Sequence, residues 1–124
     1  MKVSRSRFER LAEASLAEIP EQFRELIVDL EISVKAVPGP EAGRWRGSRT
    51  LLGLYSGLQR ADMVSPYSGS HPPARIILYQ RNIEGLCPDE AALARQIRTT
   101  LRHELAHHFG FSDEDLKEKW PEGA

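Results

Sequence analysis

The sequence predicts an α+β domain in which a small mixed sheet of about three strands packs on helices. Three observations support this prediction. Apolar residues recur at helical spacing near the start of the chain, three strand-like segments lie between residues 30 and 81, and a long helical pattern follows from residue 89. That last pattern is the longest helical one in the chain, and it ends in the sequence His-Glu-x-x-His.

The size and composition of the chain predict one soluble, globular domain over residues 1–124, with 40% hydrophobic and 28% charged residues. Cys87 is the one cysteine, which excludes an intramolecular disulfide and suits a reducing compartment. No apolar run approaches the length of a signal sequence or a membrane span, so we expect a cytoplasmic protein with no membrane partner. The formal net charge of −1 gives no overall attraction to nucleic acid, which is not an expected partner.

Two helices are predicted before the first strand. Ser4 or Ser6 can cap the first helix, and Pro20 ends it. Proline suits a first helical position, so a second helix is expected from Glu21 to about Val28. The residues that give the first helix its apolar face are Phe8, Leu11, Ala12, Ser15, Leu16 and Ile19.

Three segments have the pattern of strands. Residues 30–36 alternate apolar and polar side chains, which predicts a strand with one buried face. Residues 50–56 form a short apolar strand containing Gly53, and a glycine inside a strand often marks a bulge or a close backbone approach. Residues 75–81 are nearly continuously apolar at their centre, so this strand is expected in the middle of the sheet.

The loop between the first two strands carries Arg44, Trp45, Arg46 and Arg49. A basic cluster with an aromatic residue could bind a phosphate backbone. Because the total charge is close to neutral, the favoured interpretation is a solvated loop with Trp45 packed against the body of the domain.

The helix expected after Asp89 has a buried stripe and a separate polar face. Asp89 is the predicted N-cap, and Gly110 can end the helix in a left-handed conformation. His108 falls inside the apolar arc, so we interpret it as a packed or hydrogen-bonded core histidine. The buried stripe consists of Leu93, Ile97, Leu101 and Leu105.

The His-Glu-x-x-His sequence predicts a metal site on the polar face of this helix. His103 and His107 are one turn apart, so both rings can reach one ion. Glu104 lies about 100° round from His103, where a general base can act on bound water. The chain reversal at Gly110 can return Asp113 as a third ligand. Two imidazoles, one carboxylate and an open fourth position describe a catalytic zinc site.

Other interpretations of these residues stay open. His103 and His107 could be polar residues on a solvated helix face. Either Ser112 or Asp113 could cap a short C-terminal helix, and Ser112-x-x-Asp115 has the pattern of a capping box.

The segment His103-Glu104-x-x-His107-x-x-Gly110-x-x-Asp113 resembles the pattern of the aspartate-liganded zincins, close to the metzincin consensus. The resemblance implies a zincin-like fold in which the two histidines and Asp113 bind Zn²⁺ and Glu104 is the catalytic base. The eleven residues after Asp113 hold no methionine, whereas metzincins place a methionine-containing turn there.

The chain also resembles a family of very small bacterial zincin-like metallopeptidases. This likeness runs from Phe8 to Leu116 and includes residues 52–55, 75–79 and 103–113, in that order. In zincins, the strand that borders the active-site cleft pairs with an extended peptide. By resemblance, the candidate substrate-binding residues are Leu52, Gly53, Leu54 and Tyr55, although an ordinary edge strand would give the same pattern.

The expected function is hydrolysis of peptide bonds in a peptide or protein substrate by zinc-activated water, with Glu104 as general base. Tyr55, Tyr79 and His71 are candidate stabilisers of the oxyanion. One alternative is a zinc-stabilised binding module without turnover, which the small size of the chain favours. The other is a zinc-dependent ribonuclease, supported by the arginines of the loop at residues 41–49.

Overall fold

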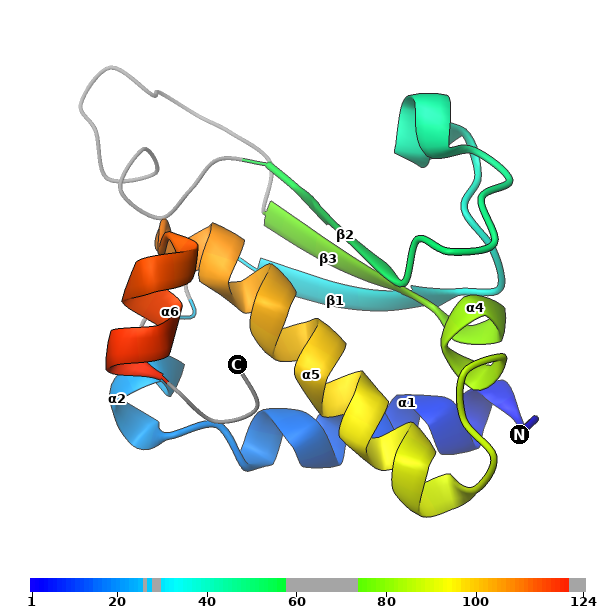
Figure 1. Cartoon of the computed structure of the whole chain (residues 1–124), viewed down its shortest axis with the longest axis horizontal. Helices are drawn as coiled ribbons and strands as arrows, with labels where there is room; N and C mark the ends of the chain where they lie inside the picture. The colour runs from blue at the N-terminus through cyan, green and yellow to red at the C-terminus, as the bar shows by residue number, and fades with distance from the viewer. Residues whose placement is uncertain (26, 28–29, 58–73, 121–124) are drawn as a thin grey trace.

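Helices α1 (Arg5–Ala17) and α5 (Glu90–Phe109) lie side by side and form the layer that covers one face of a three-stranded sheet (Figure 1). The computed structural model describes residues 1–25, 27, 30–57 and 74–120, except the side chain of Asp113. The expected α+β architecture, a mixed sheet of three strands packed on helices, is confirmed. Within the described residues, no helix combines the length and the apolar character needed to cross a membrane.

The sheet has the order β1-β3-β2. Strand β3 (Ala74–Tyr79) is central, as predicted, and all its side chains except that of Arg75 are buried. Strand β1 (Leu30–Lys35) pairs with it in parallel, and β2 (Gly53–Ser56) pairs with it in antiparallel orientation. Among the described strands, β2 therefore forms one edge of the sheet.

Several of the expected elements have different bounds. The first helix ends at Ala17, before Pro20, and the second strand begins at Gly53 rather than at residue 50. The second helix, α2 (Glu21–Arg24), ends before the predicted Val28 and has Pro20 as its N-cap rather than its first residue. The predicted third strand stops at Tyr79, and the chain continues directly into a short helix, α4 (Gln80–Glu84), that the sequence did not predict.

The ends of α5 follow the sequence prediction. The Asp89 carboxylate accepts a hydrogen bond from the Ala92 N–H at 2.8 Å, which satisfies one of the free donors of the first turn. Gly110 ends the helix with φ 77° and ψ 24°, the left-handed conformation. The predicted buried stripe and His108 are all at most 1% exposed: Leu93, Ile97, Leu101, Leu105 and His108.

An aromatic cluster closes the end of the domain where α5 ends. Phe23 stacks on Trp120 with ring centroids 4.9 Å apart and also contacts Phe109 and Phe111. The Arg102 guanidinium lies over the Trp120 ring, and one of its N–H groups donates to the Trp120 carbonyl. These contacts tie the C-terminal helix α6 (Asp113–Lys119) to α2 and α5.

The segment between β1 and β2 projects from the body of the domain and contains the 3₁₀ helix η1 (Pro40–Trp45) (Figure 1). Trp45 was expected to pack against the domain, but its side chain is 47% exposed, so that expectation is wrong. Its ring is instead covered on one side by the Arg44 guanidinium, 5.0 Å from the ring centroid.

The left-handed end of α5 gives a prediction about stability. Replacing Gly110 by alanine should lower the free energy of unfolding by about 1–2 kcal/mol, because a Cβ is strained at its positive φ. Gly85 is the matched control, since it follows α4 with φ −62° and has room for a methyl group. Gly85→Ala should therefore cost nothing measurable in urea denaturation. Equal losses in both variants would contradict this account of the helix end.

Candidate functional site

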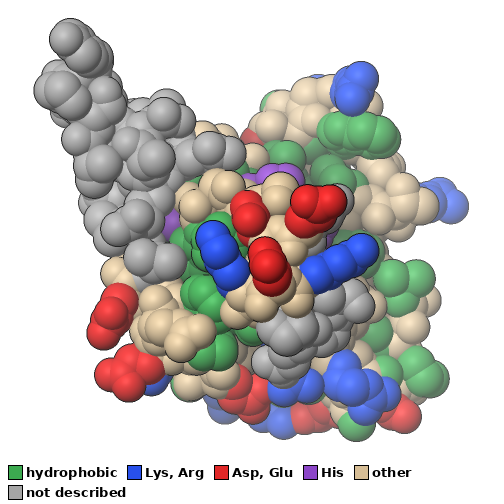
Figure 2. Space-filling view, turned by 60° about the vertical axis from the view of Figure 1, so that its left-hand side comes forward, with side chains coloured by type: hydrophobic (Ala, Val, Ile, Leu, Met, Phe, Trp, Pro, Cys, Tyr) green, Lys and Arg blue, Asp and Glu red, His purple; other side chains and the backbone are tan. Residues whose placement is uncertain are grey.

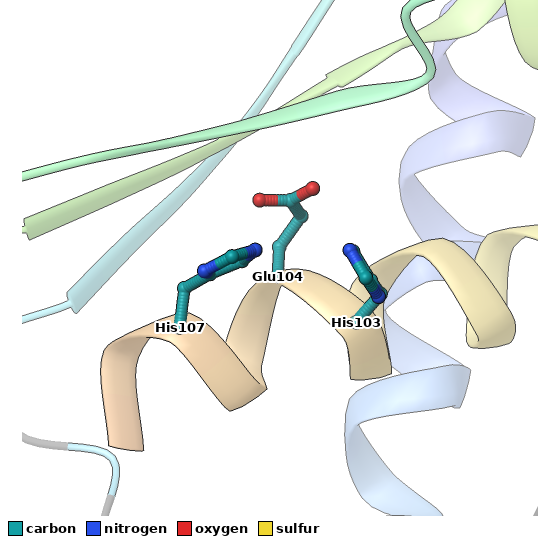
Figure 3. A group of neighbouring side chains, drawn as sticks. All are labelled: His103, Glu104 and His107. Atoms are coloured by element: carbon teal, nitrogen blue, oxygen red, sulfur yellow. The ribbon is translucent and has the colours of Figure 1, made fainter. Parts of the chain in front are cut away.

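His103, Glu104 and His107 come together on α5, below the sheet (Figure 3). One ligand atom from each residue lies within 4.8 Å of those of the other two. The two imidazole rings face each other nearly edge to face, with centroids 5.2 Å apart. The Glu104 side chain rises between them, with its carboxylate pointing toward the strands.

The donor set fits a divalent metal ion. Imidazole is a common ligand for zinc and related ions, and helical spacing already places both rings on one face. His103 and His107 are exposed, so an ion held between them would keep positions open to solvent and substrate. The group of two imidazoles and a carboxylate can therefore hold a metal ion.

Glu104 differs from the two histidines because it is 9% exposed. Burial raises the pKa of its carboxyl, since the charged form loses hydration. Positive charge on His107 and His103 opposes this rise in pKa. The backbone N–H of Tyr55 donates a hydrogen bond to the carboxylate and also lowers its pKa.

Gly53 brings strand β2 unusually close to this part of α5. A Cβ at Gly53 would lie 3.0 Å from the Thr100 methyl carbon and 3.2 Å from Glu104 Cγ. Both distances are shorter than ordinary van der Waals contact. The close backbone approach predicted for Gly53 is confirmed, and the partner is the helix that carries the candidate base.

The backbone of β2 is oriented for contact with a ligand at its open edge. Tyr79 donates its N–H to the Leu52 carbonyl at 2.9 Å, which makes these two opposed residues a hydrogen-bonded pair. Because pairing alternates in an antiparallel ladder, the N–H and C=O groups of Gly53 and Tyr55 point away from β3. The Tyr55 N–H is the donor that reaches Glu104.

A cleft of about 530 Å³ lies between the start of β2, α5 and α6. Leu52 and Gly53 line this cleft together with His103 and Glu104, whereas Leu54 and Tyr55 are not among its lining residues. Four further α5 residues, for which the sequence gave no functional prediction, also line it: Gln96, Thr99, Thr100 and Arg102. Polar residues within a helix give no separate functional signal in the sequence.

Tyr55 contacts two histidines of α5, His107 and His108. Its hydroxyl is hydrogen-bonded to His108 Nδ1 at 2.8 Å, and its ring is stacked on His107 with centroids 6.5 Å apart. His108 is completely buried, so the prediction of a core histidine is confirmed. Tyr79, another candidate stabiliser of the oxyanion, is fully buried and donates its hydroxyl to Glu41, so it is not available to the cleft. His71 lies outside the described residues.

The backbone places Asp113 at the first residue of α6, but its side chain lies outside the described part of the structure. Ser112 is the N-cap, and it forms the predicted capping box with Asp115 through hydrogen bonds of 3.0 and 3.1 Å. The helix is therefore capped without Asp113. Its assignment as third ligand stays a prediction.

The contact at Gly53 predicts the effect of a larger side chain. Gly53→Val should lower the free energy of unfolding by about 1–3 kcal/mol, because the added carbons overlap Thr100 and Glu104. Thr100→Ser removes the nearest methyl and keeps the hydroxyl that accepts from Gln96. In a double-mutant cycle followed by urea denaturation, the combined loss should be smaller than the sum of the single losses. Strictly additive losses would show that β2 and α5 are not in close contact here.

Comparison with known proteins agrees with this geometry. The sequence model of a family described as zincin-like metallopeptidases matches residues 27–121, which include all three strands, α5 and α6. A search of proteins with curated functions found no match. Membership of the matched family implies a divalent metal, in agreement with the donor set on α5. The chain therefore belongs to the zincin-like metallopeptidase family.

Proposed function

We propose that the protein is a zinc-dependent peptidase, in which His103, His107 and Asp113 hold the ion and Glu104 is the general base. The observation that carries this proposal is the position of the group on α5. The exposed His103 imidazole and the buried Glu104 carboxylate line a cleft at the start of the edge strand β2, and the exposed His107 imidazole lies beside them on α5. Asp113 is included because its spacing after Gly110 matches the pattern of aspartate-liganded zincins.

The substrate would be an extended peptide or protein segment that adds to the edge of β2. The main-chain groups of Gly53 face that edge, and an added strand gains affinity from such groups without regard to side chains. Leu52 lines the cleft beside Gly53 and would contact a substrate side chain. The cleft volume of about 530 Å³ is within the range of small-molecule sites, so the small size of the domain still leaves room for part of a substrate.

Glu104 would accept a proton from the attacking water and pass it to the leaving amine. A bound zinc ion supplies Lewis-acid chemistry, which makes the water more acidic and polarises the scissile carbonyl. The Tyr55 N–H and the contact with Gly53 hold the Glu104 side chain in one position. Burial keeps competing water away from the carboxylate, so that its basicity is available to the reacting water.

The proposal includes a cytoplasmic location. Its support is the single cysteine, Cys87, which is buried and can form no disulfide within the chain.

Replacing Glu104 by glutamine tests the assignment of the base. The variant should keep its zinc and lose about 10²–10⁴-fold in turnover of a quenched-fluorescence peptide library, because the amide cannot accept the proton. Zinc content measured on the same sample separates loss of the base from loss of the metal. Turnover equal to that of the wild type would remove Glu104 as the base. Absence of turnover in both proteins, with zinc bound, would favour a zinc-stabilised binding module.

A further inference from the structure

The segment of residues 37–49, which we call the η1 lobe, is held firmly to the sheet. The Glu41 carboxylate accepts hydrogen bonds from Lys35 Nζ at 2.9 Å, the Gly39 N–H at 2.8 Å and the Tyr79 hydroxyl at 2.9 Å. Its hydrogen bonds with Lys35 and Gly39 hold the pKa of the Glu41 carboxyl at about 2. This carboxylate is therefore ionised at neutral pH and joins the lobe to β1 and β3.

The other end of the lobe is anchored as well. The Asn82 side-chain amide donates to the carbonyls of Ser48 and Leu51, at 2.9 and 2.7 Å. The Gly47 N–H donates to the Pro38 carbonyl at 2.9 Å. This hydrogen bond joins the segment that leaves β1 to the segment that leads toward β2. The lobe thus has a fixed shape, and its outer side chains are presented without a large ordering cost on binding.

The outer surface of the lobe combines positive charge with exposed apolar area. Arg44, Arg46 and Arg49 are exposed, and no described carboxylate forms an ion pair with any of them. Trp45 and Val37 are 47% and 46% exposed, which places them among the few large hydrophobic side chains open to solvent in the described part of the chain. Figure 2 shows basic and hydrophobic side chains together on this projecting part, at its upper right.

Such a surface fits a partner that carries carboxylates and some apolar area. Guanidinium groups form paired hydrogen bonds with carboxylates, and an indole ring supplies apolar contact. The one acidic residue of the lobe, Glu41, is already engaged with Lys35, so it does not neutralise the arginines. The whole chain has a net charge of −1, so attraction to an acidic partner is local to this lobe.

The lobe runs directly into the cleft. Arg49 is followed by Thr50, and residues 50–53 line the cleft with His103 and Glu104. A polypeptide that lies along the edge of β2 and continues past the start of the strand would therefore reach the lobe (Figure 1).

Resting on the proposed peptidase function, we propose that the η1 lobe binds an acidic segment of the protein substrate, outside the part that occupies the cleft. Three exposed arginines and one exposed indole between residues 44 and 49 form a short basic segment, which matches a few carboxylates on a polypeptide. A nucleic acid would require a longer basic track along its backbone. The continuity of the lobe with the candidate peptide cleft also favours a polypeptide.

The experiment measures binding, so that it does not depend on turnover. Two fluorescein-labelled peptides of about twelve residues, roughly 40 Å long when extended, are compared. They differ only in having glutamates or glutamines in one half. Fluorescence anisotropy with the Glu104→Gln variant should show about tenfold tighter binding of the glutamate peptide at low salt. This advantage should shrink as salt is added.

Replacing Arg44, Arg46 and Arg49 together by glutamine should abolish the preference for the glutamate peptide. The matched control replaces Arg10, Arg24 and Arg95, which are also exposed and form no ion pair among the described residues, and it should keep the preference. Equal thermal unfolding of both triple variants shows that the fold is retained.

Three outcomes would overturn the proposal. These are equal binding of the two peptides to the unchanged lobe, a preference that survives the lobe substitutions, and tighter binding of single-stranded RNA or anionic vesicles than of the glutamate peptide. The binding result can be interpreted separately from the test of peptidase activity. An inactive protein that prefers the glutamate peptide through its lobe retains the docking site and loses only the enzymatic role.

Discussion

The contact between β2 and α5 at Gly53 is the constraint on which the candidate site depends. Because residue 53 has no side chain, the strand lies within van der Waals distance of Thr100 and Glu104. That approach buries the Glu104 carboxylate and lets the Tyr55 N–H reach it. The same approach places an open strand edge above two exposed imidazoles. A wider spacing would leave Glu104 solvated and separate the strand edge from the histidines.

Helix α5 serves both the core and the site because its two faces are distinct. The apolar stripe is buried against the sheet and α1, while His103 and His107 lie well round the helix from that stripe. His108 links the two faces. It is completely buried, yet its Nδ1 is hydrogen-bonded to the Tyr55 hydroxyl, and the Tyr55 ring is stacked on His107. The orientation of one candidate ligand is thus tied to the packing of the core.

Local signals in the sequence were sufficient to predict α5, the central strand and the His-Glu-x-x-His group, because capping, periodicity and helical spacing act over a few residues.

Helix α4 could not be predicted, since it is fixed by Asn82, whose side chain donates hydrogen bonds to carbonyls more than thirty residues away. The exposure of Trp45 was missed for a similar reason: the lobe is held by Glu41 and Tyr79, and no local pattern reveals that bond. Gly53 indicated a close approach, but only the sheet pairing and the packing of α5 identify its partner. The cleft residues Gln96 and Thr100 carry no signal apart from their position on α5.

The central claim is that one metal ion is held by His103, His107 and Asp113. Its most direct test is the zinc content per chain after purification without chelator, for the wild type, His103→Ala, Asp113→Ala and the control Glu114→Ala. Glu114 is exposed and adjacent to Asp113, so it controls for loss of a negative charge at the start of α6. The account predicts about one zinc per chain in the wild type and in the control, with clear loss in both ligand variants. A wild-type chain that holds no zinc and takes up none when it is added would contradict it. A chain whose zinc is unaffected by Asp113→Ala would contradict the assignment of the third ligand.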